Sequence, residues 1–388
     1  MSYAFSLDDV EFLRGAAGRA ALTELAARPL TDRIADVAAA RAVAGEHAAA
    51  ALETAMLRRK ATAKLTRADG WLFTDPALQQ ATATPVAEHR ARRLADRDVH
   101  DVTCSVGADL AVLARVARRV VGSDLDPVRL AMARNNCGPA VPLVRADALH
   151  PVTRGTVVVA DPARRDDTGR RRWRPADLVP RLDLLAEVYA GRDLAVKCSP
   201  GLDFVAVEWA DEVELVSLDG TVREACLWTR DLATPGVTRR ATVLRDGTQW
   251  TITDAEPDDV PVSPVGAWIV DPDGAVVRAG LVRHYAARHG LAQIDPHIAY
   301  LTGELPPPGI RAFRVLEHGK YSEKTLRATL RARSVGTLEI LVRGLDIDPN
   351  TLRKRLKIAG PAAATVVLTR VGDTPTAIVC DAVRTVGT

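Results

Sequence analysis

Short apolar runs that alternate with helical stretches between residues 99 and 229 constrain the fold of this 388-residue chain more than any other feature. Such alternation is typical of β-α units, in which the strands form a parallel sheet with helices on both faces. The predicted strands are Val99–Val106, Val120–Asp124, Val141–Val144, Thr156–Ala160, Asp193–Lys197, Val213–Leu218 and Ala225–Thr229. The helical segments between them include Asp109–Arg119, Pro127–Asn136 and Asp177–Tyr189. The sequence therefore predicts an α/β fold with a doubly wound sheet.

The composition and the residue patterns of the chain change on either side of these β-α units. Its start is rich in Ala, Leu, Arg and Glu, which are good helix formers, and Ser6 with Asp9 is typical of a capping box. The pairs Asp246-Gly247 and Asp273-Gly274 predict hairpin turns, and the prolines of Leu305–Gly309 mark a linker. The predicted domains are an N-terminal helical domain (1–75), the sheet domain (76–235), a β-rich connector (236–309) and a small α/β module (310–388).

Composition excludes several classes of protein. The 26 glycines and 23 prolines are close to average usage, which excludes collagen-like and wholly disordered chains. No apolar run approaches the ~18–20 residues that cross a bilayer, and the start lacks a basic and then apolar leader, so we expect no membrane association. The 8 histidines form no ligand cluster, so no metal is expected. The cysteines lack CxxC spacing, which favours a reduced, cytoplasmic chain; they are Cys104, Cys137, Cys198, Cys226 and Cys380.

The first β-α unit, DVTCSVGADLAVLARVARRVVGSDLDPVRLAMARNN, carries the strongest functional signal. A predicted strand ends at Asp101, a turn of small residues leads to Gly107, and a second strand ends at Asp124. Small residues allow a ligand to approach backbone N–H groups, and an acid at the tip of the second strand can accept from both hydroxyls of a ribose. The unit predicts a nucleoside-containing cofactor. The alternative is a buried turn whose acids cap helices, as we expect of Asp126 before Pro127.

The chemistry of the turn discriminates among such cofactors. It lacks the G-x-G-x-x-G of dinucleotide folds, and the chain lacks the Gly-Lys-Ser/Thr of triphosphate loops. Asp101 would repel a pyrophosphate but suits a cation. S-adenosylmethionine carries an ammonium, a sulfonium and a ribose without phosphate, so the electrostatics favour this cofactor.

The same segment resembles motif I of class I S-adenosylmethionine-dependent methyltransferases, in the D-x-x-C-G-x-G-G form of trimethylguanosine-synthase-like enzymes. Ser105 and Ala108 replace two of its glycines, and a serine disfavours positive φ. GSDLDPVRLAMARNN resembles the post-I motif, VRADAL the motif that holds adenine, VVVADPARR motif IV, and QATATPVAEHRARRLA the helix that leads into the domain. The segment from Arg311 to Arg384 resembles the THUMP-like domain fused to such enzymes in bacteria.

The resemblance implies a Rossmann-like methyltransferase sheet, a THUMP-like module at 310–388, and S-adenosyl-L-methionine as cofactor. The residues it implies for cofactor binding are Asp101, Thr103, Gly107, Asp124, Leu125, Asp147 and Ala148. Asp161 takes the catalytic position, where it accepts from a target amine or orients a nucleophile, and Pro162 fixes the backbone beside it. The aromatic residue that follows in amino-methyltransferases is absent. Lys197 is expected to shape the substrate pocket.

A basic loop follows the motif IV segment. Arg164–Arg174 holds six arginines, two aspartates and Trp173. Arginines with an interleaved ring suit phosphate contacts and base stacking, so Arg164 and Trp173 are predicted to bind substrate; the alternative is a solvated loop. Cys198 follows a predicted strand at a place where some enzymes use a nucleophilic cysteine, but we favour a small buried thiol.

Positive charge is concentrated at the C-terminal end. The whole chain has a formal net charge of +3, yet residues 311–388 hold 14 Lys+Arg against 7 Asp+Glu, which leaves −4 on the rest. The basic side chains fall into two predicted helices, at Ser322–Ala332 and Pro349–Lys357. Basic helix faces predict RNA docking through phosphates; the alternative is an accessory domain that packs on the catalytic one.

The predicted function is methyl transfer to a base in structured RNA, either tRNA or rRNA. Two alternatives stay open. One is a non-catalytic RNA-binding protein that retains a methyltransferase fold, and the other is a small-molecule or protein methyltransferase. The sequence predicts no oligomeric state.

Overall fold

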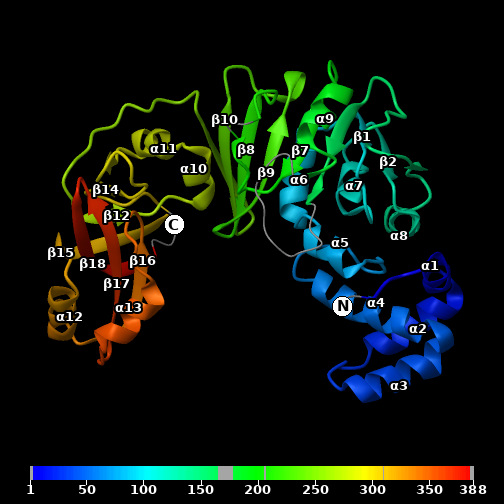
Figure 1. Ribbon diagram of the computed structural model, residues 1–388, viewed down its shortest axis with the longest axis horizontal. Helices are drawn as coiled ribbons and strands as arrows, with labels where there is room; N and C mark the ends of the chain where they lie inside the picture. The colour runs from blue at the N-terminus through cyan, green and yellow to red at the C-terminus, as the bar shows by residue number, and fades with distance from the viewer. Residues whose placement is uncertain (1–2, 165–177, 205–206, 309, 385–388) are drawn as a thin grey trace. The chain divides into compact units, whose positions relative to one another are not determined.

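The computed structural model describes residues 3–164, 178–204, 207–308 and 310–384. The chain divides into two compact units, which are coloured from blue to green and from green to red in Figure 1. Unit 1 comprises Met1–Thr238 and Leu244–Thr248, and unit 2 comprises Arg239–Val243 and Gln249–Thr388.

Unit 1 begins with a helical region. Its elements are α1 (Leu7–Arg14), α2 (Ala16–Ala26), α3 (Arg33–Ala44), η1 (Gly45–His47) and α4 (Ala48–Ala61). Ser6 and Asp9 form the predicted capping box at the start of α1. The buried residues of these helices belong to the same apolar cluster as Val106 and Met132, which come from the sheet region. The helical region therefore shares a core with the sheet region that follows.

The sheet of unit 1 has the predicted β-α organisation. Its strands are β1 (Asp98–Asp101), β2 (Arg119–Asp124), β3 (Leu143–Arg145), β4 (Val157–Ala160), β7 (Leu194–Cys198), β8 (Glu212–Leu218) and β9 (Thr221–Trp228). They are arranged in the order β8-β9-β7-β4-β1-β2-β3. The pairs from β7 to β3 are parallel, whereas β9 runs antiparallel to both β7 and β8. The connecting and flanking helices are α5 (Asp75–Gln80), α6 (Thr84–Arg92), α7 (Ala108–Leu113), α8 (Pro127–Cys137) and α9 (Leu182–Val188).

This topology determines where a ligand can bind. The central strand β4 is buried along its whole length, as expected for a parallel strand covered on both faces. The order of strands along the chain reverses between β1 and β4. Ligands of open α/β sheets bind outside the carboxyl ends of the strands at such a switch point. The short hairpin of β5 (Ala163–Arg164) and β6 (Leu178–Val179) follows β4.

Unit 2 contains a second, mixed sheet with the strand order β13-β14-β12-β15-β18-β17-β16. Its strands are β12 (Trp268–Val270), β13 (Ala292–Gln293), β14 (Leu301–Gly303), β15 (Arg311–Lys320), β16 (Val335–Val342), β17 (Ala362–Val371) and β18 (Thr374–Arg384). The helices are α10 (Gly274–Ala279), α11 (Val282–His289), α12 (Glu323–Ala332) and α13 (Pro349–Leu356). Leu326 and Leu330 of α12 and Leu352 and Leu356 of α13 pack into one apolar cluster with residues of this sheet. The predicted α/β fold class is confirmed in both units.

The two predicted Asp-Gly hairpins have different outcomes. Asp246 and Gly247, with φ of +49° and +74°, connect β10 (Arg239–Arg245) and β11 (Thr248–Thr253) as a hairpin. The hairpin predicted at Asp273-Gly274 is wrong. Asp273 is instead the N-cap of α10, where its Oδ1 accepts from the N–H of Ala275 at 2.9 Å. The same residue pair suits both structures, because aspartate also satisfies the free N–H groups at the start of a helix.

The stretch predicted as a connector supplies strands to the same sheet as the predicted C-terminal module. β12 pairs with β15 through Trp268–Arg314 and Val270–Ala312, and β14 pairs with the other edge of β12. The boundary expected between residues 309 and 310 therefore falls inside one continuous sheet. The division into four domains stays a prediction.

Candidate active site

A cavity of about 450 Å³ lies at the carboxyl ends of β1, β2 and β4 in unit 1. Carboxylates dominate its charged lining. The acidic residues that line it are Asp101, Asp109, Asp124, Asp126, Asp147 and Asp161, and the basic ones are Arg90, Arg129, Arg181 and Lys197. The sequence predicts Asp101, Asp124, Asp147 and Asp161 for this site, and the fold brings them together.

The turn after β1 forms one wall of the cavity. Ser105 has a φ of +49°, so a serine does adopt the left-handed conformation that the sequence disfavours at this position. Its N–H donates to Asp124 Oδ2 at 2.9 Å, which compensates for the strain. Gly107 is the N-cap of α7 with a φ of +85°, and a Cβ there would lie 2.6 Å from Cys137 Sγ. Gly107 shapes the turn without lining the cavity.

Asp101 is a buried acid at the end of β1. Its side chain is almost inaccessible, with 4% of the residue exposed, and its Oδ1 accepts from the N–H of Thr103 at 3.1 Å. Burial and the neighbouring carboxylate of Asp109 raise its pKa to about 8, against the smaller opposing effect of the Thr103 N–H. A cationic ligand beside Asp101 would favour the ionised form.

Asp124 and Asp126 have separate tasks at the end of β2. The two oxygens of Asp124 accept from backbone N–H groups, Oδ1 from Asp126 and Oδ2 from Ser105, each at 2.9 Å. This fixes the carboxylate at the cavity wall and leaves lone pairs for a ligand. Asp126 caps α8 by accepting from the N–H of Val128 at 2.8 Å, as predicted. Leu125 between them is 59% exposed and lines the cavity, an unusual position for a large apolar side chain.

Asp147 and Ala148 lie in the loop that follows β3. Asp147 Oδ1 accepts from the N–H of Leu149 at 2.9 Å, and the carbonyl of Ala148 accepts from the hydroxyl of Tyr189 at 2.6 Å. These bonds hold the loop so that all three of its residues line the cavity. With Leu125 they provide an apolar surface beside a carboxylate, which suits a heteroaromatic ring with an amino group.

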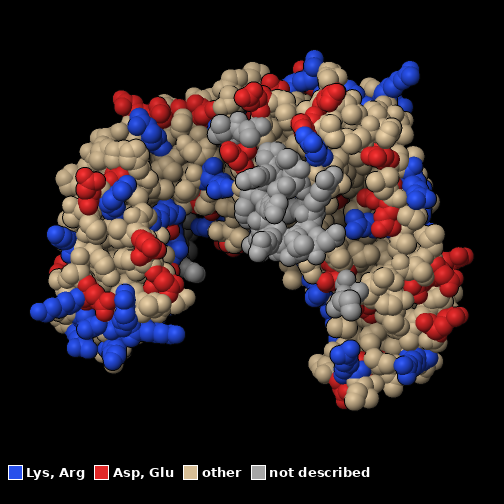
Figure 2. All heavy atoms as spheres, viewed as in Figure 1, with Lys and Arg blue, Asp and Glu red and all other residues tan. Residues whose placement is uncertain are grey.

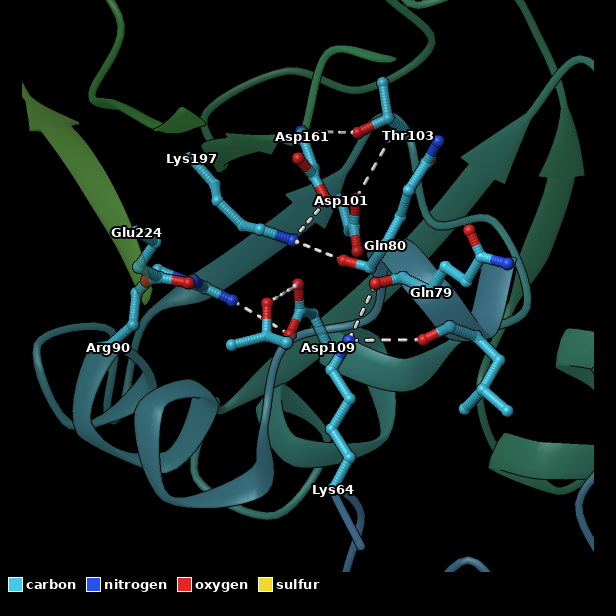
Figure 3. Close-up of polar contacts among 12 residues, drawn as sticks. Lys64, Gln79, Gln80, Arg90, Asp101, Thr103, Asp109, Asp161, Lys197 and Glu224 are labelled. Carbon is cyan, nitrogen blue, oxygen red and sulfur yellow. Dashed lines mark hydrogen bonds and ion pairs between the residues drawn. The ribbon is translucent and has the colours of Figure 1, made fainter. Parts of the chain in front are cut away.

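Asp161 and Lys197 form an ion pair in the cavity, shown in Figure 3. Asp161 follows β4 and Lys197 lies on the adjacent strand β7, and Nζ is 2.5 Å from Oδ2. The N–H of Asp161 donates to Thr103 Oγ1 at 2.7 Å, which ties the residue to the turn after β1. Burial lowers the pKa of Lys197, but Asp161, Asp109 and Glu224 outweigh it and raise the pKa overall. Lys197 is therefore a cation held beside the carboxylate of Asp161, which accepts its hydrogen bond.

Sequence reasoning missed a buried ionic network below this pair. Arg90 of α6 places Nη2 2.9 Å from Asp109 Oδ1 and Nη1 2.5 Å from Glu224 Oε1 (Figure 3). Burial raises the pKa of Asp109, but Arg90 and Lys197 lower it overall. Asp109 could have been predicted from the sequence, because it is an acid two residues after the turn glycine. Glu224 lies 134 residues from Arg90, so no local pattern relates them.

Two lysines converge on the last carbonyls of α5, the helix whose Ala77 and Gln80 line the cavity. Lys64 Nζ donates to the carbonyls of Gln79 at 2.8 Å and Leu78 at 3.2 Å, and Lys197 Nζ donates to that of Gln80 at 3.2 Å (Figure 3). Burial, Lys197 and Arg223 lower the pKa of Lys64. Lys64 follows α4, so the helical region takes part in building this cavity.

The remaining predicted residues either do not line the cavity or fall outside the described residues. Pro162 is buried beside Asp161 and does not appear among the residues that line the cavity. Arg164 lies on strand β5, and Trp173 falls outside the described residues. Cys198 is buried, and burial raises the pKa of its thiol, which disfavours a nucleophilic thiolate and supports the buried-thiol prediction.

The basic helices of unit 2 contain two kinds of cation. Arg327 and Arg355 both pair with Glu323, and Arg353 donates to the carbonyl of Leu338. The exposed side chains of Lys324, Arg331, Lys354 and Lys357 lie on the same helices or next to them. Figure 2 shows Lys and Arg gathered at this end of unit 2.

The structure gives no sign of a metal or of a membrane segment in the part of the chain that it describes. Within those ranges, no three His, Cys, Asp or Glu side chains are grouped so as to hold a metal ion. No described helix is both long and apolar enough to cross a membrane.

Family models match both ends of the chain. Residues 310–382 match the family described as THUMP domain-like, and residues 6–61 match a Domain of unknown function (DUF8688). Two curated relatives are described as uncharacterized S-adenosylmethionine-dependent methyltransferases of Mycobacterium tuberculosis, one from strain CDC 1551 / Oshkosh and one from strain ATCC 25618 / H37Rv. Each is 56% identical to this chain, over 86% of the chain and 95% of the relative.

A solved structure shares the fold over nearly the whole chain. It is the crystal structure of a proposed methyltransferase from Porphyromonas gingivalis W83, with a TM-score of 0.74 and 18% identity. The alignment covers 98% of this chain and 100% of that one. At this level of identity the likeness extends to the fold alone.

Proposed function

The chain belongs to the class I S-adenosylmethionine-dependent methyltransferases that carry a THUMP-like domain, and from this membership we propose that it methylates a base in structured RNA. The observation that carries the methyl-transfer part is the acid-lined cavity. It brings together Asp101, Asp124 and Asp147, from the ends of three successive strands, with the Asp161–Lys197 pair.

The residues of this cavity fit S-adenosylmethionine by charge and by shape. Carboxylates outnumber cations around it, which suits a ligand that carries an ammonium and a sulfonium. Asp101 would face the cationic end, and Asp124 would accept from the ribose hydroxyls. Asp147 and the backbone of Ala148 would hold the adenine against Leu125. Thr103 and Gly107 shape the turn between these groups.

The chain's own residues position the acceptor. The bound cofactor supplies a methyl group on a sulfonium, which a nucleophile displaces in line. Such a step needs orientation more than covalent help. Asp161 would accept a hydrogen bond from an N–H of the target amine and so direct the nitrogen lone pair. Lys197 holds Asp161 in place, and Pro162 restricts the backbone beside it.

Support for an RNA substrate comes from the C-terminal end. The THUMP-like match covers β15 to most of β18, including the two basic helices. Lys324, Arg331, Lys354 and Lys357 are exposed there and suit contacts with phosphates. The five cysteines are free, which supports a cytoplasmic location.

Two measurements on the full chain test the proposal. Calorimetry with S-adenosylhomocysteine should detect binding that Asp124→Ala abolishes. Transfer of a labelled methyl group to RNA from cells that lack the chain should then occur with the wild type, and should fall by about 100-fold or more in Asp161→Ala, which loses orientation while it retains cofactor. No binding at millimolar ligand would reject the enzyme in favour of a fold-retaining RNA-binding protein. Transfer to protein or small molecules, with RNA inert, would reject the substrate.

The role of the basic helices has its own control. Replacing Lys324, Arg331, Lys354 and Lys357 by alanine should lower the dependence of RNA affinity on salt concentration. Replacing Arg314, an exposed arginine of the same unit that pairs with Asp381, should leave it nearly unchanged. Equal slopes in both variants would favour an accessory module that packs without contacting RNA.

A further inference from the structure

A second cavity, of about 190 Å³, lies next to the cofactor cavity within unit 1. The start of α6, one face of α7 and four residues of the loop between α4 and α5 line it; the loop residues are Leu65, Thr66, Arg67 and Trp71. Ala108 lines both cavities, and Thr82, from the second, donates to Asp109 Oδ2 of the first at 3.3 Å. A ligand in the second cavity would therefore lie immediately beside the cofactor cavity. The cavity is below the roughly 300–1,000 Å³ that encloses a whole drug-sized ligand, so it suits one part of a larger ligand.

The charges of the two cavities are opposite. Among the described residues that line the second cavity, there is no aspartate or glutamate, whereas Arg67 and Arg115 are both present and exposed. Arg115 makes a 3.3 Å contact with Glu88, and both side chains are well exposed, so this pair is weak. Two exposed arginines, of which Arg115 has only this weak pair among the described residues, favour an anion. A phosphate that the cofactor cavity would repel is thus suited to the cavity beside it.

Trp71 presents an aromatic ring in the same cavity, on a segment that is held rigidly. The carbonyls of Gly70 and Trp71 accept from Arg58 at 2.8 and 2.9 Å. On the other side, the N–H of Leu72 donates to Asn136 Oδ1 at 2.8 Å, and the Leu72 carbonyl accepts from Asn136 Nδ2 at 2.9 Å. Trp71 is partly exposed, and its side chain also packs against the apolar cluster of the helical region. A partly exposed ring on a held segment needs little ordering before a base stacks on it.

The backbone conformation of Arg67 is also unusual. Its φ is +63°, in the left-handed region that an arginine rarely adopts. Residues held in such conformations cost about 1–3 kcal/mol and gather at binding sites. Here the conformation occurs in the loop that carries Leu65, Thr66 and Arg67 into the cavity lining.

We propose that this second cavity binds one nucleotide of the RNA strand next to the methylated base, with the base against Trp71 and a phosphate between Arg67 and Arg115. An aromatic ring with flanking arginines suits a single-stranded nucleic acid, because base stacking and phosphate contacts do not depend on which base is present. The inference rests on the proposed RNA substrate and assigns the flanking-nucleotide site to the cavity that α7 lines beside the cofactor cavity.

The test uses the full chain and a decamer of oligouridylate that contains 4-thiouridine. Irradiation should cross-link the decamer to the peptides that carry residues 65–84 or 108–115, as mapped by mass spectrometry. Trp71→Ala should weaken binding of the decamer by about 5- to 100-fold, and Trp71→Phe should restore most of the loss because it keeps a ring. The double variant Arg67→Ala/Arg115→Ala should lower the logarithmic salt slope by about 0.7, the value for one phosphate contact on a single strand.

Two controls separate this cavity from folding and from overall charge. S-adenosylhomocysteine should bind Trp71→Phe and the double arginine variant as it binds the wild type, which shows that unit 1 is folded. The variant Arg33→Ala/Arg41→Ala removes the same charge from exposed positions of α3 that line neither cavity, and it should keep the wild-type salt slope.

The outcomes distinguish this site from the proposed function. Decamer binding that is unchanged in the alanine variants, with cross-links outside both peptides, overturns the second site. RNA methylation by the wild type would still stand in that case. A wild-type chain that binds cofactor but neither binds the decamer nor methylates RNA overturns the RNA substrate and this site together.

Discussion

Asp101 is a carboxyl whose pKa the fold changes strongly. In water a carboxyl of this kind has a pKa near 3.8, whereas burial and Asp109 raise it to about 8. Between these values the folded chain holds a proton that the unfolded chain has lost. The contribution of Asp101 to the free energy of unfolding therefore falls as pH rises from about 4 to 8. A bound cation reverses the preference, because it stabilises the ionised form.

The first prediction concerns the pH dependence of cofactor binding. If the ammonium of the ligand contacts ionised Asp101, the affinity for S-adenosylhomocysteine should rise by up to tenfold per pH unit below about pH 8 and level off above it. Calorimetry at pH 7 in buffers of different ionisation enthalpy should show release of nearly one proton. Asp101→Asn should bind weakly and independently of pH. A flat profile in the wild type would contradict the role of Asp101.

A second prediction concerns the space beside Gly107. Gly107→Ala should destabilise the chain by more than the ~1–2 kcal/mol of left-handed strain, because its Cβ would lie 2.6 Å from Cys137 Sγ. Gly280 provides the matched control, since it has the same left-handed conformation, with a φ of +76°, and a Cβ there meets nothing within 4 Å. Chemical denaturation of both variants, and of Gly107→Ala/Cys137→Ala, separates strain from collision. Equal losses of stability in Gly107→Ala and in the control glycine-to-alanine variant would show that the collision with Cys137 is relieved at no cost.

Among the elements, the short helix α5 depends most on residues outside itself. Its six residues are too few for a stable isolated helix, and the lysines at its end satisfy carbonyls that would lack partners. Lys64 comes from the helical region and Lys197 from the sheet. The helix is thus fixed from two directions where it contributes Gln80 to the cofactor cavity.

The third prediction is that Lys64→Met weakens cofactor binding through α5. Loss of two charge-assisted hydrogen bonds should lower the free energy of unfolding by about 1–2 kcal/mol and reduce the affinity for S-adenosylhomocysteine, and Lys64→Arg should rescue part of both. Lys60 pairs with Asp75 at the other end of the same helix but is exposed, so Lys60→Met should change neither quantity appreciably. Calorimetry and thermal unfolding measure the two effects. Wild-type affinity in Lys64→Met would exclude the coupling.

Helices and strands could be predicted from the sequence where the residues that determine them lie within a few positions of one another. The strand ends that carry Asp101 and Asp124, and the cap formed by Asp126, follow from patterns within a few residues. The Asp273-Gly274 pair failed because a local signal shared by hairpins and helix starts cannot decide between them. Arg90 and Glu224 were missed because two strands and a helix must fold before they meet.

For the whole molecule, the continuity of the unit 2 sheet matters most. Phe313, Val367 and Ile378 belong to one apolar cluster with Ile269 and Tyr300, which precede residue 310. The C-terminal module therefore has part of its core in the stretch predicted as a connector.

The fourth prediction follows from this shared core. A chain truncated after residue 309 should leave Ile269 and Tyr300 exposed, so it should bind a hydrophobic dye and unfold at a lower temperature than the full chain. Loss of RNA binding in that truncation would not identify an RNA-contacting surface, and charge substitutions on α12 and α13 are the sharper experiment. A truncated chain that binds no dye and retains the full melting temperature would show that the module is independent.

The acid lining of the cofactor cavity has a consequence for turnover. In the proposed reaction the sulfonium becomes a neutral thioether, so the product carries one positive charge fewer than the molecule that entered. Carboxylates that attract the reactant therefore attract the product less, and the cavity contributes to its own clearance. The product should therefore bind less tightly than the reactant, and an inhibitor that keeps a positive charge at the sulfur position should outcompete the product.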